Sequence, residues 1–211
     1  MITHIAYQPE PLNITGTDVY ESWNTRIEQF KKILAHHYSN EVIVATINIL
    51  GTKYHESEID PLTALFRELA RWEGLQKNQT RVAVLGKWYT LPGRLVEAIK
   101  ELIESTKDYD STFLNMYLNY DSKEEMVDAV KNISRAVSAG KQDVELINQE
   151  TLRDNTYTPH TPPPQKIVLT NNQKNLNTSL YDAPTIRIII SEKKFEELTL
   201  EDIKRFEQQD L

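Results

Sequence analysis

The spacing of apolar residues along this chain alternates between two patterns, which predict two kinds of element. Residues 113–120 are densely apolar, as in a buried strand, whereas apolar residues in the stretch 126–137 recur every three or four positions, as on one face of a helix. The period changes at Tyr120. We therefore predict a buried strand over residues 112–119 that leads directly into a helix.

The junction between this strand and its helix is the first candidate for a ligand site. Ser122 is a good N-cap for the helix, and Glu124 and Glu125 fall in its first turn. Open α/β sheets bind ligands where buried strands end, and anions bind the free N–H groups of helix N-termini. The pattern therefore indicates a present or former ligand site just after Tyr120.

The same patterns continue along the chain and predict a layered α/β fold. The stretch 41–50 is too uniformly apolar for a strand with one solvated face, so we predict a central parallel strand. Strands and helices alternate with short connections, which favours a single domain whose mostly parallel central sheet is covered by helices on both faces. The predicted strands are 2–7, 41–50, 81–86, 112–119, 167–170 and 185–191, and the predicted helices are 18–37, 61–72, 92–103, 126–137, 149–155 and 200–208, the last capped by Thr199.

Composition narrows the class of protein. A chain of 211 residues with 39% hydrophobic content can bury one sizeable core, so we expect one domain over residues 1–211. The formal charge of −7 argues against non-specific nucleic-acid binding. No run approaches the roughly 18 apolar residues of a membrane span, and the N-terminus lacks the regions of a signal peptide. We therefore expect a cytoplasmic protein with at most peripheral membrane contact.

Several kinds of catalytic and metal site are excluded or disfavoured. The chain has no Cys, so it has no disulfide, no thiolate nucleophile and no cysteine metal site. With six glycines it also lacks the glycine-rich loops that cradle phosphates. His36 and His37 end a predicted helix, where a cationic His is favourable, and His55 lies in a polar loop with acidic neighbours. We predict no metal site at either place.

Blocks of residues that occur in a fixed order along nearly the whole chain resemble a known family. In the N-terminal two thirds these blocks are His4-Ile5-Ala6, residues 81–86 before Leu91-Pro92, Leu114-Asn115 through Asn119-Tyr120, and residues 125–130. In the C-terminal third they are Leu152, Tyr157-Thr158, Pro162, Pro164, Ile167, Thr170 and residues 195–203. This order is similar to that of the cis-prenyltransferases, the undecaprenyl and dehydrodolichyl diphosphate synthases.

The resemblance implies a fold and a chemistry. Members of this family condense isopentenyl diphosphate onto an allylic diphosphate with Mg²⁺, act as dimers, and hold the growing chain in an apolar tunnel between the sheet and the helices. Such chemistry needs a carboxylate that places the metal on a diphosphate. It also needs arginines, whose forked guanidinium groups form paired hydrogen bonds with phosphate oxygens.

The family's metal-binding loop is only partly kept in this sequence. After His4-Ile5-Ala6 the family carries Asp-Gly-Asn and then an arginine, where this chain reads Glu10-Pro11-Leu12-Asn13-Ile14. The resemblance therefore makes Glu10 the counterpart of the metal-binding and diphosphate-binding aspartate. Pro11 and Leu12 remove the flexible glycine and the polar asparagine that help the loop to hold a diphosphate.

The cationic positions are lost further along the chain. Where the family has Gly-Gly-Arg, this chain has Asp121-Ser122-Lys123, and where the family has two arginines it has an uncharged stretch at 168–173 and Asn175. Arg187 falls in register with a metal-binding glutamate. The candidate diphosphate contacts that remain are Lys123, Asn119 and Asn13.

Magnitudes favour a loss of the usual activity. Each lost hydrogen bond to a charged group costs about 1.5–3 kcal/mol, and about 1.4 kcal/mol is a factor of ten in rate. Loss of two arginines and a metal-binding glutamate would therefore lower the rate by several orders of magnitude.

Our first interpretation is a non-catalytic subunit, or pseudoenzyme, that pairs with a catalytic homologue or with itself. It lacks the C-terminal Arg-x-Gly motif of such subunits. The alternative is a repurposed enzyme that processes prenyl diphosphates through Glu10, Lys53 and Lys123. Mg²⁺ is expected only if the chain is catalytic.

Overall fold

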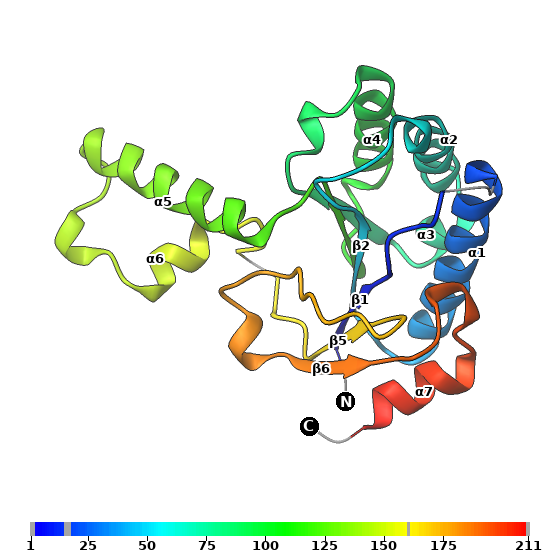
Figure 1. Cartoon of the computed structure of the whole chain (residues 1–211). Coiled ribbons are helices and arrows are strands. Elements are labelled where there is room, and N and C mark those ends of the chain that lie inside the picture. The colour runs from blue at the N-terminus through cyan, green and yellow to red at the C-terminus, as the bar shows by residue number, and fades with distance from the viewer. Residues whose placement is uncertain (1–2, 15–17, 160, 210–211) are drawn as a thin grey trace.

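The protein is built around one parallel sheet. A computed structural model describes residues 3–14, 18–159 and 161–209. Its six strands follow the order β3-β4-β2-β1-β5-β6, and each neighbouring pair is parallel (Figure 1). The predicted single-domain α/β fold with a parallel central sheet is therefore confirmed. The strands are β1 (His4–Gln8), β2 (Val44–Leu50), β3 (Thr80–Leu85), β4 (Thr112–Leu118), β5 (Lys166–Leu169) and β6 (Arg187–Ile190).

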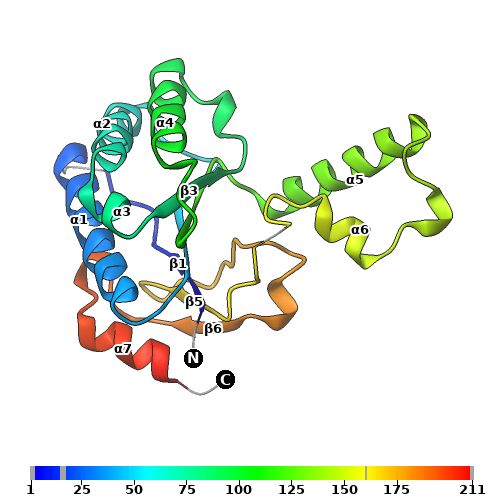
Figure 2. The ribbon, with the colours of Figure 1, turned by 180° about the vertical axis from the view of Figure 1, so that it is seen from behind.

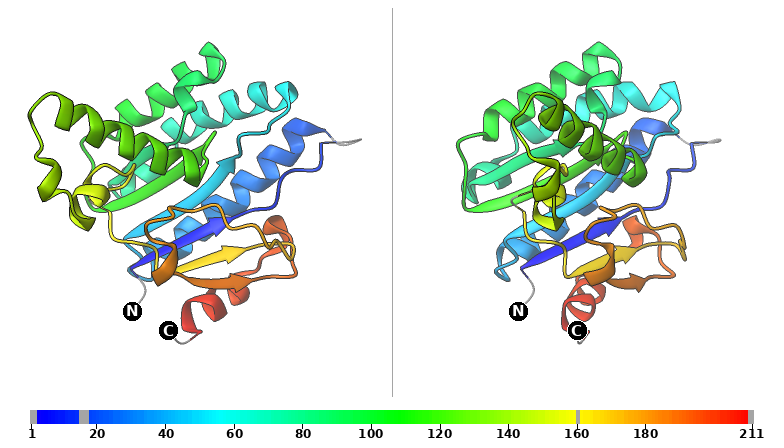
Figure 3. Two further views of the ribbon diagram at one scale, coloured as in Figure 1. Left: turned by 60° about the vertical axis from the view of Figure 1, so that its left-hand side comes forward. Right: turned by 90° about the vertical axis from the view of Figure 1, so that its left-hand side faces the viewer.

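Helices flank this sheet unequally. The first four form a layer against one face, whereas α5 and α6 begin at the other side and extend away from the sheet as an arm (Figures 1 and 2). α7 lies beside the C-terminal part of α1, close to the edge strand β6 (Figure 3). The helices are α1 (Val19–Tyr38), α2 (Ile59–Ala70), α3 (Glu73–Lys77), α4 (Gly93–Thr106), α5 (Ser122–Ser138), α6 (Gln149–Asp154) and α7 (Leu200–Gln208).

The main core fills the space between the sheet and the layer of α1, α2 and α4. Large apolar side chains from each of these elements are fully buried in one continuous cluster. Because the central strand β2 lies between β1 and β4, its residues are buried along almost the whole strand, as the apolar run at 41–50 predicts. The largest members of the cluster include Trp23, Phe30, Phe66, Ile47 and Leu62, each at most 1% exposed.

The structure corrects several predicted boundaries. Ser122 does not cap α5. Asp121 is the N-cap, and its carboxylate accepts hydrogen bonds from the backbone N–H groups of Lys123 and Glu124 at 2.8 and 3.2 Å. Strand β2 begins at Val44 because Glu41 has a φ of 60°, which ends the extended backbone of the predicted strand. Ile2, predicted to begin β1, lies outside the described residues.

The last helix agrees with its prediction, whereas the predicted strand 185–191 is shorter in the structure, where β6 spans Arg187–Ile190. Thr199 caps α7 as expected. Its hydroxyl accepts from the backbone N–H of Asp202 at 3.2 Å, and the Asp202 carboxylate accepts from the N–H of Thr199 at 2.9 Å.

Among the described residues, none of the helices has the length and apolar character needed to cross a bilayer.

Candidate functional site at the carboxyl edge of the sheet

A cavity of about 430 Å³ opens where the carboxyl ends of β1 and β2 meet the loops that follow them. This is the edge at which parallel sheets place their ligands. Glu10 and Arg26 line its floor, and Lys53 comes from the loop after β2. The lining also includes amide side chains from the strands and from the loop after β5. These are Gln8 of β1, Asn48 of β2, and Gln173 and Asn177 of the loop.

Glu10, the predicted counterpart of the metal-binding aspartate, is held by groups of the protein itself. It lies two residues beyond β1 and is 8% exposed. Oε2 of its carboxylate accepts a hydrogen bond from the Thr170 hydroxyl at 2.5 Å and another from the backbone N–H of Phe195 at 3.3 Å. Three chain segments, those after β1 and β5 and before α7, therefore converge on this one carboxylate.

Arg26 supplies the charge that balances Glu10. It lies on the buried face of α1 and is 3% exposed. Its Nη2 is 3.8 Å from Oε1 of Glu10, and its Nη1 donates to the Glu10 backbone carbonyl at 2.7 Å. Its Nε donates to Glu196 at 2.5 Å. Because a buried charge is strongly unfavourable unless it is paired, this guanidinium accounts for the burial of the Glu10 carboxylate, while Glu196 is only partly buried.

The segment after β5, which replaces the family's arginine-containing loop, carries several amides and the exposed Lys174, and it folds back onto the strand ends. Gln173 donates from Nε2 to the Gln8 carbonyl at 2.9 Å, and the backbone N–H of Asn177 donates to Oε1 of Gln8 at 2.8 Å. Asn48, in β2, donates to the Asn177 carbonyl at 2.8 Å. Amide groups of one chain thus satisfy one another across the edge of the sheet, where cationic side chains would otherwise face a diphosphate.

The anion site predicted at the start of α5 is already occupied by the protein. The Asp121 carboxylate accepts from the N–H groups that an anion would bind, and its negative charge opposes a second anion there. Lys123 is exposed in the first turn. The N-terminus of α5 is therefore capped by an internal carboxylate.

Asn119 has a structural role in the turn after β4. It adopts a φ of 46°, and its Nδ2 donates to the Lys87 carbonyl at 3.3 Å and to the Thr90 hydroxyl at 3.0 Å. It lines a second cavity of about 320 Å³, separate in its lining from the one that contains Glu10. Asn13 is exposed in the loop after Glu10. The structure therefore does not gather the four predicted site residues around one cavity.

Arg187 does not lie where its register with the family suggested. It is the first residue of β6, where it pairs with the first residue of β5, and it is exposed. Glu10, in contrast, follows the carboxyl end of β1. The predicted cation at a metal position is therefore at the opposite end of the strands from the Glu10 cavity.

Sequence analysis also missed Arg26 and Thr170 as partners of Glu10. A signal for Arg26 was available, because Trp23, Ile27 and Phe30 surround it on the apolar face of α1. An arginine at such a position has to be paired within the fold. Nothing local in the sequence marks Thr170, which lies 160 residues from Glu10.

Comparison with known proteins shows the family. The family model described as "Putative undecaprenyl diphosphate synthase" matches residues 15–208. The chain belongs to the cis-prenyltransferase family. The match covers the helical layer, strands β2 to β6, the arm and α7, but it does not include β1 or Glu10.

The chain matches only part of the length of its curated relatives. The chain is 31% identical over 160 residues to the tritrans,polycis-undecaprenyl-diphosphate synthase (geranylgeranyl-diphosphate specific) of Pyrococcus horikoshii, which covers 72% of this chain and 61% of that protein. It is 32% identical over 145 residues to the human dehydrodolichyl diphosphate synthase complex subunit DHDDS, covering 66% of this chain and 44% of that protein.

Two solved structures share the fold. Lavandulyl diphosphate synthase from Lavandula x intermedia, solved with dimethylallyl diphosphate, superposes with a TM-score of 0.87 at 20% identity, covering 97% of this chain and 93% of that one. A probable undecaprenyl diphosphate synthase from Campylobacter jejuni superposes with a TM-score of 0.76 at 21% identity, covering 100% and 97% of the two chains. The fold of these two structures therefore extends over nearly the whole length of this chain.

Proposed function

We propose that this chain is a non-catalytic cis-prenyltransferase homologue that acts as a subunit beside a catalytic homologue in polyprenyl diphosphate synthesis. The observation that carries the proposal is the internal pairing of Glu10. Its carboxylate accepts hydrogen bonds from Thr170 and Phe195 and faces the Arg26 guanidinium, so the one acidic residue in register with the family's metal ligand serves the fold.

The residues around Glu10 do not fit Mg²⁺. This ion needs near-octahedral oxygen ligands at about 2.0–2.1 Å. A buried guanidinium beside the carboxylate opposes a divalent cation, since like charges repel strongly in a partly buried site. We therefore derive no step of a reaction through Mg²⁺ on this chain.

The hydrogen bonds of the loop after β5, whose one cation is the exposed Lys174, support the same conclusion for the diphosphate. Gln173 and Asn177 are bonded to Gln8, and Asn48 is bonded to the same loop. A diphosphate that entered this edge would have to break several of these bonds and would meet amides in place of arginines. Charge-assisted pairs with phosphate are about twice as strong as neutral hydrogen bonds.

The filled core also supports the proposal, because it leaves little space for a long polyprenyl product. A long polyprenyl chain needs an apolar tunnel between the sheet and the helices. In this chain Trp23, Phe30 and Phe66 belong to the core cluster in that space and are at most 1% exposed. Side chains of this size would have to move together to admit such a chain.

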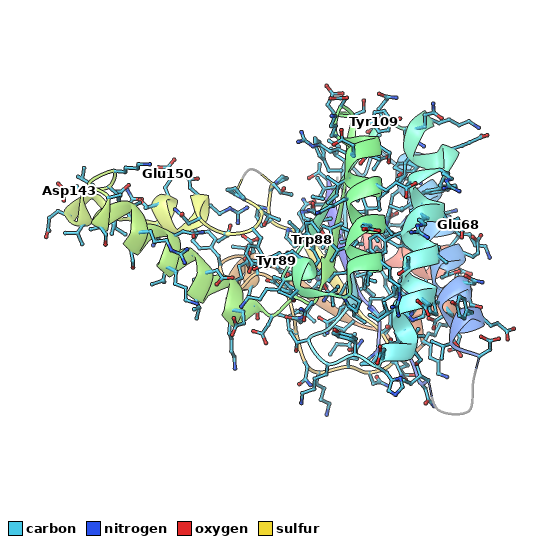
Figure 4. The ribbon with its side chains drawn as sticks, turned by 90° about the horizontal axis from the view of Figure 1, so that it is seen from above. Glu68, Trp88, Tyr89, Tyr109, Asp143 and Glu150 are labelled. Carbon is cyan, nitrogen blue, oxygen red and sulfur yellow. The ribbon has the colours of Figure 1, made fainter. Side chains whose placement is uncertain are left out.

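The arm formed by α5 and α6 gives the proposed subunit a surface for a partner. It extends from the body of the molecule, with Asp143 and Glu150 near its far end (Figure 4). Large apolar side chains on this arm are exposed, and apolar patches on a protein surface are typical of interaction sites. They are Val127, Val130, Val144, Leu146 and Ile147, which are 37–67% exposed.

Reconstitution of the reaction tests this proposal. The chain alone, with Mg²⁺, radiolabelled isopentenyl diphosphate and farnesyl diphosphate, is expected to give no labelled lipid. Added to a complete cis-prenyltransferase encoded in the same genome, it is expected to co-purify with that enzyme and to raise its turnover. Labelled lipid made by the chain alone would contradict the proposal, as would a lack of any effect on the complete enzyme.

A repurposed prenyl diphosphate-processing enzyme is the second candidate, and one observation favours it. The cavity of about 430 Å³ beside Glu10 remains open and includes Lys53 in its lining. If the chain turns over a short allylic diphosphate by itself, Lys53→Ala is expected to lower that activity at least about tenfold, because a charged contact to phosphate is lost. Lys100→Ala, an exposed position on α4, is the matched control.

A further inference from the structure

A cluster of metal-ligating side chains lies where α7 packs against α1, away from the Glu10 cavity. His36 and His37, for which the sequence pattern predicts no metal site, lie in the last turn of α1, and Glu207 lies near the end of α7. Their ligand atoms are all within 4.8 Å of one another. His36 follows Arg26 by ten residues of helix, about 15 Å along its axis, so the cluster is distinct from the candidate site.

Within the cluster, the potential metal-ligand atoms of the two histidines and of Glu207 face one another. Nε2 of His36 is 3.1 Å from Oε2 of Glu207, and Nδ1 of His37 is 2.9 Å from Oε1 of the same carboxylate. The His37 ring and the carboxylate are not aligned for a hydrogen bond. Among the described residues, Nδ1 of His37 and Oε1 of Glu207 are therefore two buried polar atoms without a hydrogen-bond partner.

This arrangement holds three ligand groups together with little access of solvent. Nδ1 of His37 and Oε1 of Glu207 make no aligned hydrogen bond and lie 2.9 Å apart as an ion pair, which requires a protonated ring. His37 is 1% exposed, so water does not solvate its ring freely. A cation between the two imidazoles and the carboxylate would satisfy all three groups at once.

We propose that His36, His37 and Glu207 form a binding site for one divalent transition-metal ion such as Zn²⁺, which holds α7 onto α1. Two imidazoles and one carboxylate are a donor set that suits zinc, cobalt or nickel better than magnesium or calcium. Ligand atoms of one tetrahedral zinc ion lie roughly 3–4 Å apart, given bonds of about 2.0–2.2 Å. The observed separations need only small side-chain shifts to reach that spacing.

The surroundings orient the His37 ring as in protein metal sites. Nε2 of His37, the nitrogen that faces away from Glu207, is 2.9 Å from the Tyr7 hydroxyl. Metal-ligating histidines usually hold their second ring nitrogen with such a partner. Lys166, which is buried nearby, donates to the backbone carbonyls of Phe206 and Glu207 at 3.0 and 2.9 Å. These bonds fix the end of α7, and with it the Glu207 side chain.

Cobalt binding tests the proposal without any assay of activity. The full chain, prepared without a histidine tag and stripped with a chelator, is titrated with Co²⁺ while its visible absorption is recorded, and Zn²⁺ is then added. We expect saturation at one equivalent, displacement by Zn²⁺, and a rise in the midpoint of thermal unfolding with Zn²⁺. Absence of saturable binding by the folded protein would overturn the proposal.

Single substitutions test which residues bind the ion. Glu207→Gln keeps the shape of the side chain and removes its charge, so it is expected to weaken binding at least about tenfold. Glu201→Gln, an exposed position on the same helix, is expected to bind as the unchanged protein does. His36→Gln provides a second test if Glu207→Gln does not fold by circular dichroism. Equal affinity in the folded ligand variants, or loss of binding in His55→Gln instead, would refute the assignment.

Discussion

Arg26 is the residue on which the interpretation of the carboxyl edge depends, because it converts a potential metal ligand into half of a buried ion pair. Glu10 and Glu196 both approach its guanidinium. A buried pair of this kind stabilises the fold little compared with apolar residues, but breaking it leaves a charge without compensation. The pair therefore holds the loop after β1 against α1.

We expect Arg26→Met to destabilise the fold by about 3–5 kcal/mol, because it leaves the buried Glu10 carboxylate unpaired. Addition of Glu10→Gln in the same chain is expected to recover part of this loss, since no buried charge then remains. Urea unfolding of the two single variants and the double variant gives the coupling between the sites.

Arg94→Met is the matched control. Arg94 pairs with Asp60 on the surface, where both side chains are about half exposed, so its loss is expected to cost under about 1 kcal/mol. A small effect of Arg26→Met, similar to that of the control, would show that Glu10 is not held by Arg26.

His4 makes the stability of the protein depend on pH. Burial is the main cause that lowers the pKa of His4 from 6.5 to about 4, against the opposing effect of the Pro162 carbonyl. Nδ1 contacts that carbonyl at 2.6 Å and Nε2 contacts the Thr46 hydroxyl at 2.8 Å, so a neutral ring satisfies both. The unfolded chain therefore binds a proton more readily than the folded chain does.

Stability from His4 is expected to be fully present above pH 6.5 and to be lost progressively as the pH falls from 6.5 to about 4. The two pKa values differ by an amount that corresponds to a loss of about 3 kcal/mol. His37, whose pKa burial also lowers, contributes in the same direction. Urea unfolding between pH 7 and pH 4 measures the slope, and His4→Gln is expected to reduce it. An unchanged slope in that variant would contradict the assignment to His4.

At the scale of elements, the turns after β3 and β4 bring the two strand ends together. Gly86 has a φ of +104°, and a Cβ at this position would lie 2.4 Å from the Leu118 carbonyl oxygen. Asn119 nearby also has a positive φ, and its amide bonds the loop after Gly86. The close approach of two backbones at this edge thus requires glycine at position 86.

Gly86→Ala is expected to destabilise the fold by about 1–3 kcal/mol, because the new methyl group meets a backbone carbonyl and the φ is strained for alanine. Gly93→Ala is the control. Nothing lies within 4 Å of a Cβ at Gly93, which begins α4, so unchanged or slightly raised stability is expected. Thermal unfolding of both variants decides the point, and equal midpoints would argue against a tight turn at Gly86.

The attachment of α5 to the sheet depends on a buried carboxylate that its position in a first helical turn does not reveal. Glu125 is 0% exposed. It accepts a hydrogen bond from the Tyr120 hydroxyl at 2.7 Å and another from the backbone N–H of Tyr157 at 2.8 Å. Burial is the main cause that raises the pKa of Tyr120 far above its usual value, so the hydroxyl stays protonated and donates. These hydrogen bonds therefore hold the start of α5, which is the base of the arm.

At the scale of the whole molecule, the arm and its exposed apolar residues make this chain suited to assembly. The arm extends from the body of the protein and carries Val130 at 55% and Leu146 at 67% exposure. Whether the partner is a second copy or a catalytic homologue, the arm is the surface that we expect it to cover.

Val130→Lys combined with Leu146→Lys is expected to weaken the assembly at least about tenfold, because a partner would have to bury two charges. Leu200→Lys, at a residue of α7 that is 50% exposed, is the control and is expected to leave assembly unchanged. Sedimentation velocity of the chain alone and with the homologue measures both cases. Assembly that is insensitive to the arm variants would exclude the arm as the interface.

The order and type of the major elements followed from the sequence because they depend on local spacing. The apolar face of α1 and the uniformly apolar β2 were visible as periods of residues close in the chain. Boundaries failed where a single side chain or φ decided them, as Asp121 did for α5 and Glu41 for β2. The loss of cationic residues after β5 was also visible, since it needed only the identities of the residues.

The sequence by itself therefore determined the fold class, the family resemblance and the absence of the family's arginines. Only the tertiary structure decided what the remaining polar groups do. Glu10 meets Thr170 across 160 residues, and His36 meets Glu207 across 171. No local period encodes such contacts, because they form only when parallel strands bring distant loops to one edge and when α7 packs on α1.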